Sequence, residues 1–210
     1  MNKELIIRTN SDHVDFALLK DGKLIELHKE QETSNFQVGD IFIAKIRKPV
    51  AGLNAAFVHV GHDKDAFLHY HDLGPNLASQ LKFIKLVNAG KIKDFSLKNF
   101  QFEKEIDKDG SITDIINSNQ SILVQVVKEP ISTKGPRISA ELSLAGRFIV
   151  LVPFSDRVSI SQKIEDKKEK ERLKRLVQSV KPKGFGVIVR TVAEGKTTVE
   201  LEKDLQSISL

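Results

Sequence analysis

The sequence of 210 residues predicts an α+β protein that combines a small β-barrel with a part containing helices. Short β-type segments separated by turns fill residues 14–69 and return at 121–127, a spacing typical of small barrels. Segments with an apolar stripe at helical spacing follow after residue 164. The composition agrees with a folded protein, because 40% of the residues are apolar and 29% are charged.

The β-type segments begin with a hairpin. Residues 14–19 and 24–27 flank Asp21-Gly22, a dipeptide that suits a tight turn. Strands are then expected at 40–46, 55–60 and 66–69, and a strand at 121–127 is expected to close the barrel. Residues 78–119 between them predict a long, partly irregular insertion with a short helix near residues 81–87.

The remaining elements alternate between strand and helix. Strands are predicted near 137–142, 147–152 and 186–190, and a charged helix at 165–178 ends before Pro182. Thr197 and Glu200 have capping-box spacing and start a last helix, whose apolar stripe still runs at Leu210. We therefore expect the sequence to be a piece of a longer protein.

Composition excludes several classes of protein and site. Without Cys there is no disulfide framework, thiolate zinc site, iron–sulfur cluster or cysteine nucleophile, which suits a reducing compartment, so a cytoplasmic location is expected. No signal segment stands out, and the most apolar run, residues 148–152, is too short to span a bilayer, so no membrane partner is expected. A net charge of +5 and a pI near 9.3 favour polyanions weakly.

Two rings form the first candidate site. Phe57 and Phe67 lie on neighbouring predicted strands, where they could stack on unpaired bases, with Lys45, Arg47 and Lys48 nearby for phosphates. The alternative is that both rings are buried in the core, as a Phe in a strand commonly is.

Two basic segments form further candidates. Arg190-Thr191 ends a predicted strand, where a guanidinium fork and a hydroxyl suit a phosphate, and the alternative is a surface ion pair. Lys128, Lys134 and Arg137 surround a Gly-Pro loop that could follow a phosphate backbone, and the alternative is a solvated basic turn.

A cluster of histidines and aspartates raises the question of a metal site. None of the standard helical ligand spacings is present, and an exposed polar turn explains the same residues. The cluster comprises His59, His62, His69, His71, Asp63, Asp65 and Asp72. No catalytic triad, phosphate-cradling glycine motif or carboxylate pair stands out, so the residues alone predict a binding protein with no catalytic or metal-ligating residues.

Several segments together resemble the amino-terminal half of the ribonuclease E/G family of bacterial endoribonucleases, more closely the shorter ribonuclease G type. They occur in family order at 53–61 (LNAAFVHVG), 66–69 (AFLH), 124–130 (VQVVKEP), 133–137 (TKGPR), 144–147 (LAGR), 161–164 (SQKI), 171–174 (ERLK), 188–191 (IVRT) and 194–195 (EG). Each match is weak alone, but the collinear set covers nearly the whole chain.

The resemblance implies an OB-fold barrel inserted into a ribonuclease-H-like α/β domain. Residues 1–35 would start that domain, 36–128 would form the barrel with a long insertion near 78–119, and 129–210 would complete the domain and its 5′-end-sensing pocket. The region near 78–119 is longer than the family barrel leads us to expect.

The resemblance also implies roles for residues. Phe57, Phe67, Lys128, Lys134 and Arg137 would bind RNA. The pocket for a 5′-monophosphate would comprise Gly146, Val150, Arg190 and Thr191, with Arg190 and Thr191 on the phosphate and Val150 against the terminal base.

The resemblance further implies what the parent protein does. It would be a magnesium-dependent endoribonuclease that cleaves single-stranded RNA in RNA processing and decay, and a homo-oligomer. Its magnesium-binding aspartates lie downstream of these segments, so we expect this chain to bind RNA without a cofactor and without cutting it, as a monomer or weak dimer. The alternatives are a standalone RNA-binding or ribosome-associated adaptor module and a small metal-dependent hydrolase built on the histidine cluster.

Overall fold

The computed structural model of the chain describes residues 2–10, 13–31, 36–92, 96–130 and 134–208. The chain divides into two compact units, residues 1–37 and 38–210. The predicted domain boundary at residue 35 lies outside the described residues. Thr133, the first residue of the segment 133–137, also lies outside them.

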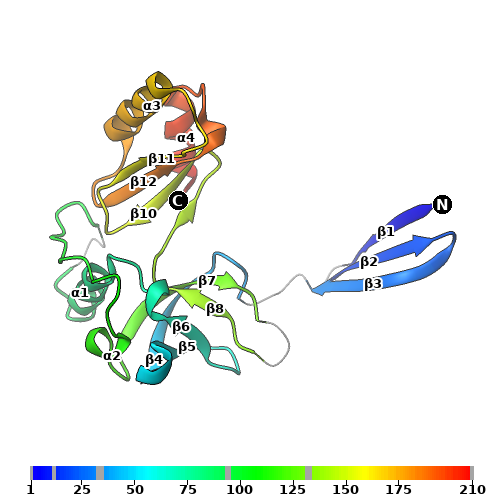
Figure 1. Cartoon of the computed structure of the whole chain (residues 1–210), viewed down its shortest axis with the longest axis horizontal. Coiled ribbons are helices and arrows are strands. Elements are labelled where there is room, and N and C mark those ends of the chain that lie inside the picture. The colour runs from blue at the N-terminus through cyan, green and yellow to red at the C-terminus, as the bar shows by residue number, and fades with distance from the viewer. Residues whose placement is uncertain (1, 11–12, 32–35, 93–95, 131–133, 209–210) are drawn as a thin grey trace. The chain divides into compact units, whose positions relative to one another are not determined.

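The first unit is an antiparallel sheet of three strands in the order β1-β2-β3, drawn in blue in Figure 1. Its strands are β1 (Lys3–Thr9), β2 (His13–Lys20) and β3 (Lys23–Gln31). The predicted hairpin is confirmed, because Asp21 (φ 48°) and Gly22 (φ 76°) both take the positive φ of a tight hairpin turn. The sequence analysis did not predict β1, since its apolar residues form a run instead of alternating.

The second unit contains a closed five-stranded barrel in the order β4-β5-β6-β8-β7. Its strands are β4 (Ile41–Val50), β5 (Ala55–His59), β6 (Ala66–His69), β7 (Ser121–Lys128) and β8 (Arg137–Ser139). As predicted, β7 closes the barrel, pairing antiparallel with β4 from Ile41↔Gln125 to Lys45↔Ser121. The barrel is consistent with the expected OB fold.

Alternating side chains fill the barrel. Its fully buried residues include Ile46, Val58, Leu68, Ile122 and Val124. Two 3₁₀ turns accompany its strands, η1 (Ala51–Leu53) and η2 (Tyr70–Asp72). Strand β8 ends earlier than predicted, because the Ala140 N–H leaves the sheet and donates to the Asp72 carbonyl (2.8 Å).

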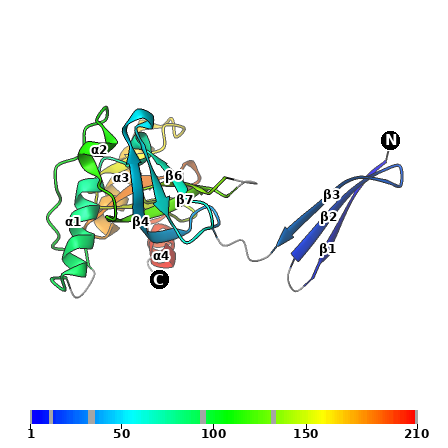
Figure 2. The same ribbon diagram turned by 90° about the horizontal axis from the view of Figure 1, so that it is seen from below.

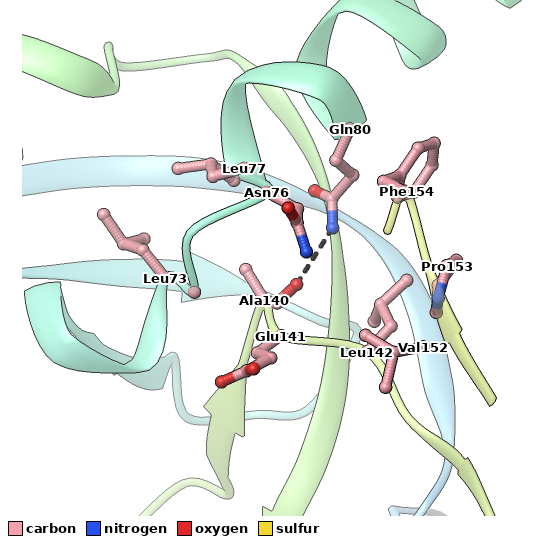
Figure 3. Close-up of a pocket in the computed structure, with 11 residues that line it drawn as sticks. Leu73, Asn76, Leu77, Gln80, Ala140, Glu141, Leu142, Val152, Pro153 and Phe154 are labelled. Carbon is pink, nitrogen blue, oxygen red and sulfur yellow. Dashed lines mark hydrogen bonds between the residues drawn. The ribbon is translucent and has the colours of Figure 1, made fainter. Parts of the chain in front are cut away.

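The insertion contributes α1 (Leu77–Asn88) and α2 (Ile112–Ile115), which lie on one side of the barrel in Figures 1 and 2. Buried Gln80 fastens α1 to the barrel, because its Nε2 donates to the Ala140 carbonyl (3.1 Å) and its Oε1 accepts from the Leu123 N–H (3.2 Å). Figure 3 shows this junction, where a cavity of about 10 Å³ leaves no room for a ligand. Helix α1 is thus packed against the barrel.

Aromatic rings join the insertion to the last part of the chain. The Phe83 ring lies 5.6 Å from Phe100 and 5.5 Å from Phe154, both in edge-to-face arrangements, and Phe154 directly follows β10. Residues 96–111 contain no helix or strand, as predicted for an irregular stretch.

The last part of the second unit is a four-stranded sheet in the order β11-β12-β10-β9. Its strands are β9 (Leu144–Ala145), β10 (Ile149–Pro153), β11 (Val158–Ile160) and β12 (Phe185–Val189). Helices α3 (Lys167–Val180) and α4 (Thr198–Ile208) cover one face, with Leu173 and Leu205 packed among Ile149, Leu151 and Val187 (Figure 1). Short β11 was not predicted, and the predicted combination with residues 1–35 into one ribonuclease-H-like domain stays a prediction.

The barrel core makes a first testable prediction. Replacing fully buried Leu68 with Ala removes most of a side chain from a closed core, so the free energy of unfolding should fall by about 2–4 kcal/mol. Urea unfolding measures this, with Ile43→Ala as the control, because Ile43 is on the same barrel but 77% exposed. Equal losses in the two variants would contradict the packing.

Candidate nucleic-acid interface

Five exposed side chains form a row across the barrel, one from each strand. The pairings Lys48↔Phe57, Phe57↔Phe67, Phe67↔Arg137 and Arg137↔Lys128 place them side by side in the order β4, β5, β6, β8 and β7. We call these residues the barrel row. Two rings in its centre and cations at its ends give one surface that can meet both bases and phosphates of a single strand.

The centre of the barrel row is exposed. Phe57 and Phe67 are 38% and 36% exposed, and their ring centroids lie 6.1 Å apart in an edge-to-face arrangement. The structure therefore does not support the alternative of two core rings. It leaves ring surface that a base could cover.

Two β-bulges put cations at the ends of the barrel row. The β4–β5 register shifts between Ile46 and Lys48, and the β7–β8 register shifts between Val126 and Lys128. Residues two apart in a strand normally face the same side. Here Ile46 and Val126 are buried while Lys48 and Lys128 are exposed, because each bulge adds one residue and turns the next side chain outward.

A basic loop borders the rings. An open groove of about 590 Å³ lies beside the two rings. Its lining includes Phe57 and Phe67 together with Lys134, Gly135 and Pro136 of the loop. A Cβ on Gly135 would lie 2.5 Å from the Asp65 carbonyl oxygen, so only glycine lets the loop approach the turn before β6 so closely. The exposed Lys134 side chain is thereby held beside the ring pair.

The cations around the barrel row differ in how they are paired. Arg137 donates through Nη2 and Nε to the Asp72 carboxylate (3.0 and 3.3 Å) and remains 50% exposed. Arg47 and His59 both lie 3.6 Å from Oδ1 of Asp65. Asp72 therefore orients the Arg137 guanidinium on the row.

A second basic site lies where β12 ends, at η3 (Thr191–Ala193). The Arg190 side chain donates from Nη1 to the Gly146 carbonyl (2.8 Å), and the Thr191 hydroxyl lies 2.8 Å from the Ser161 hydroxyl. A guanidinium has five N–H donors, so most of those on exposed Arg190 remain for an anion. The alternative of a surface ion pair is not supported, because Arg190 forms no ion pair with any carboxylate that the structure describes.

Half-buried Val150 lies on the sheet beside this site. It pairs with Ala145 on β9 and with Ile188 on β12. The Arg190 side chain thus contacts Gly146, Thr191 follows Arg190 in the chain and contacts Ser161, and Val150 is placed by strand register.

Helix α3 braces the turn that follows Thr191. Glu169 accepts from Arg172 Nε and Nη2 (both 2.6 Å) and from the Gly195 N–H (2.8 Å). The hydrogen bond from Arg172, followed by that from Gly195, lowers the pKa of the Glu169 carboxyl from 4.5 to about 2. The sequence analysis predicted only a charged helix at 165–178, because neither contact is visible in the charge pattern.

Two other residues near the second site were missed. Buried Asp204 on α4 hydrogen-bonds the loop before β10, and Phe148 lies beneath Arg147 and Lys196, 5.3 and 5.2 Å from its ring centroid. The apolar stripe of α4 could have drawn attention to Asp204, which is the buried polar residue among buried neighbours Leu201 and Leu205.

The histidine cluster does not assemble into a metal site. Among the residues that the structure describes, no group of three or more His, Cys, Asp or Glu side chains could hold a metal ion. His59 faces Asp65, and His69 packs edge-to-face on His71 with centroids 5.0 Å apart.

No helix within the described ranges has the length and apolar character needed to cross a membrane.

A closed five-stranded barrel that displays rings flanked by cations is typical of proteins that bind single-stranded nucleic acid. Residues 143–209 match the model of the ribonuclease E/G family. The chain is 33% identical over 204 residues to ribonuclease G of Escherichia coli, covering 97% of this chain and 38% of that protein. It is 32% identical over 203 residues to ribonuclease G of Haemophilus influenzae (97% and 38%) and over 207 residues to ribonuclease E of a Nostoc species (98% and 26%).

Over nearly its whole length the chain is therefore similar to ribonucleases of the E/G family. It spans 38% of the length of the ribonuclease G relatives that it matches.

The low pKa of Glu169 predicts how acid affects the contacts of its carboxylate with Arg172 and Gly195. Because the carboxyl titrates near 4.5 when unfolded and near 2 when folded, it stabilises the fold above about pH 5, and this contribution is lost as pH falls toward 2. Glu169→Gln should therefore lower the free energy of unfolding by about 1–2 kcal/mol at pH 7, with the difference from the unmodified chain shrinking toward pH 3.

Denaturant unfolding between pH 3 and 7 measures this difference. Glu171→Gln is the matched control, since Glu171 lies on the same helix, is 70% exposed and contacts Arg175 at 3.5 Å. A pH-independent difference for Glu169→Gln would show that the ion pair does not stabilise the fold.

Proposed function

We propose that this chain is the RNA-binding and 5′-monophosphate-sensing portion of a bacterial endoribonuclease that cleaves single-stranded RNA in RNA processing and decay. The observation that carries the proposal is the barrel row, which aligns two exposed rings with three cations on one surface. Similarity to the ribonuclease E/G family supports RNA as the partner.

In this proposal the barrel row and the basic loop hold the body of the strand. Bases stack on Phe57 and Phe67, while Lys128, Lys134 and Arg137 contact phosphates. Lys48 joins them because β-pairing places it at the other end of the row. Stacking tolerates any base, so this surface binds single strands without strong sequence preference.

The second basic site takes the 5′ end. Arg190 offers a fork of donors and Thr191 a hydroxyl to a terminal phosphate, while Val150 contacts the first base. If the Ser161 hydroxyl donates to Thr191 Oγ1, the Thr191 proton is left for the phosphate. Gly146 contributes its carbonyl oxygen, which accepts a hydrogen bond from Arg190 Nη1 (2.8 Å).

The cutting step is assigned to no residue of this chain. Magnesium belongs in the proposal to the reaction of the whole enzyme, and the described residues contain no group of three or more His, Cys, Asp or Glu side chains that could hold a metal ion. A cytoplasmic location and a homo-oligomeric whole enzyme remain parts of the proposal.

The ring pair predicts a loss of RNA affinity without a loss of fold. Phe57→Ala and Phe67→Ala should each weaken binding of a short single-stranded RNA about 5- to 150-fold, because one stacked base contributes about 1–3 kcal/mol. Fluorescence anisotropy at fixed salt measures this, and Leu53→Ala is the control, since Leu53 is 54% exposed on the barrel outside the row. Unchanged affinity in both Phe variants would refute the barrel row as the RNA site.

The second site predicts discrimination at the RNA 5′ end. The chain should bind a 5′-monophosphate RNA about tenfold or more tightly than the same RNA with a 5′-hydroxyl, because charge-assisted hydrogen bonds contribute about 1.5–3 kcal/mol. Arg190→Ala should bring the ratio of the two affinities close to one.

Arg175→Ala is the matched control for this experiment. It removes the same charge from a side chain that is 79% exposed on α3 and should leave the ratio unchanged. Equal binding of the two RNAs by the unmodified chain would refute 5′-end sensing while leaving RNA binding by the barrel intact.

A further inference from the structure

One buried carboxylate holds the loop that connects β9 to β10. Oδ1 of Asp204 accepts from the Arg147 N–H (2.8 Å), and Oδ2 accepts from the N–H groups of Phe148 (2.8 Å) and Ile149 (3.0 Å). Asp204 lies on α4 and is only 8% exposed. Three consecutive backbone donors thus converge on one side chain that is distant in the sequence.

The same loop holds Arg190 at two points. The Gly146 carbonyl accepts from Arg190 Nη1, and the Phe148 carbonyl accepts from the Arg190 backbone N–H, both at 2.8 Å. The loop is closed by a bond from the Gly146 N–H to the Ile149 carbonyl (2.8 Å). The direction of the Arg190 guanidinium therefore depends on a loop that Asp204 fixes.

Gly146 shows how closely this loop approaches α4. A Cβ at Gly146 would lie 2.6 Å from Oδ2 of Asp204 and 2.6 Å from Cδ1 of Ile208. A side chain at position 146 would push the loop off the carboxylate. Glycine at 146 and aspartate at 204 are thus two halves of one contact.

The loop also carries positive charge around the site. Arg147 and Lys196 both lie over the Phe148 ring. An accessible carboxylate here would repel a phosphate. The oxygens of Asp204 are instead buried against backbone N–H groups, so Asp204 is suited to hold the loop and not to contact an anion.

We propose that Asp204 is a positioning residue for the 5′ phosphate of RNA. It acts through the 146–149 loop to hold the Arg190 guanidinium toward a terminal phosphate. This inference rests on the proposed function of the second basic site, which it deepens by naming the residue that orients the phosphate-binding arginine.

The test compares the affinities of Asp204→Asn for 5′-monophosphate and 5′-hydroxyl RNA. Asparagine keeps the shape of the side chain, but its NH₂ group cannot accept a hydrogen bond, so at least one backbone donor loses its partner. The ratio of the two affinities should fall at least fivefold, while the affinity for 5′-hydroxyl RNA stays within twofold. A merely structural role would lower the melting temperature without changing this ratio.

Glu202→Gln is the matched control. It removes the same charge from an exposed position on the same helix and should leave the ratio unchanged. If the unmodified chain prefers the monophosphate and Asp204→Asn keeps that preference, the inference about Asp204 is wrong and the proposed function stands. If the unmodified chain shows no preference, the proposed 5′-sensing fails and the inference fails with it.

A measurement on the unmodified chain covers the case in which Asp204→Asn does not fold. In NMR spectra, saturation with 5′-monophosphate RNA should shift the Asp204 carboxyl carbon, the Arg190 Nε–H and the amides of residues 147–149. Saturation with 5′-hydroxyl RNA should leave these signals in place. An unmoved Asp204 carboxyl and unmoved loop amides under the monophosphate would overturn the inference.

Discussion

The pairing of β7 with β4 is the contact on which the proposed RNA surface depends. It joins segments on either side of the insertion and closes the barrel. In a closed barrel the register of each strand is fixed by its neighbours on both sides. A slip of one residue would turn Phe57 or Phe67 inward, so the exposed rings are a direct consequence of closure.

Closure also explains why the insertion is anchored as it is. Gln80 on α1 hydrogen-bonds β7 and the chain just after β8, which are neighbouring strands of the closed barrel. Phe83 on the same helix packs against Phe154 beyond β10. Helix α1 therefore ties the barrel strands to the segment that leads out of the second sheet.

Much of the fold could be predicted from the sequence, because its signals are local. Alternating strands, the Asp21-Gly22 turn and the capping box at Thr197 and Glu200 all act within a few residues, and the Glu200 carboxylate does accept from the Thr197 N–H (2.9 Å). Strand β1 was missed because a run of apolar residues has no strand period. The family resemblance, and not the residues alone, indicated which basic residues form the proposed 5′-phosphate site.

The rest of the site depends on long-range pairing. Whether Phe57 and Phe67 face the core or the solvent is decided by register, and the outward direction of Lys48 and Lys128 is decided by two bulges that no local pattern marks. Asp204 meets a loop that precedes it by more than fifty residues. Such contacts follow from tertiary packing, so they appear only in the structure.

Under the proposed function, the barrel row also sets the length of RNA that one chain can hold on the barrel. Neighbouring strands lie about 4.8 Å apart, so four steps across five strands span about 19 Å. That span suits only a few nucleotides, near the lower end of the range of about 4–16 that one barrel of this kind covers. A strand that contacts the barrel over so few nucleotides dissociates easily. The short contact length thus favours rapid binding and release of RNA, with a second contact, such as one to the 5′ end, needed for the strand to remain bound.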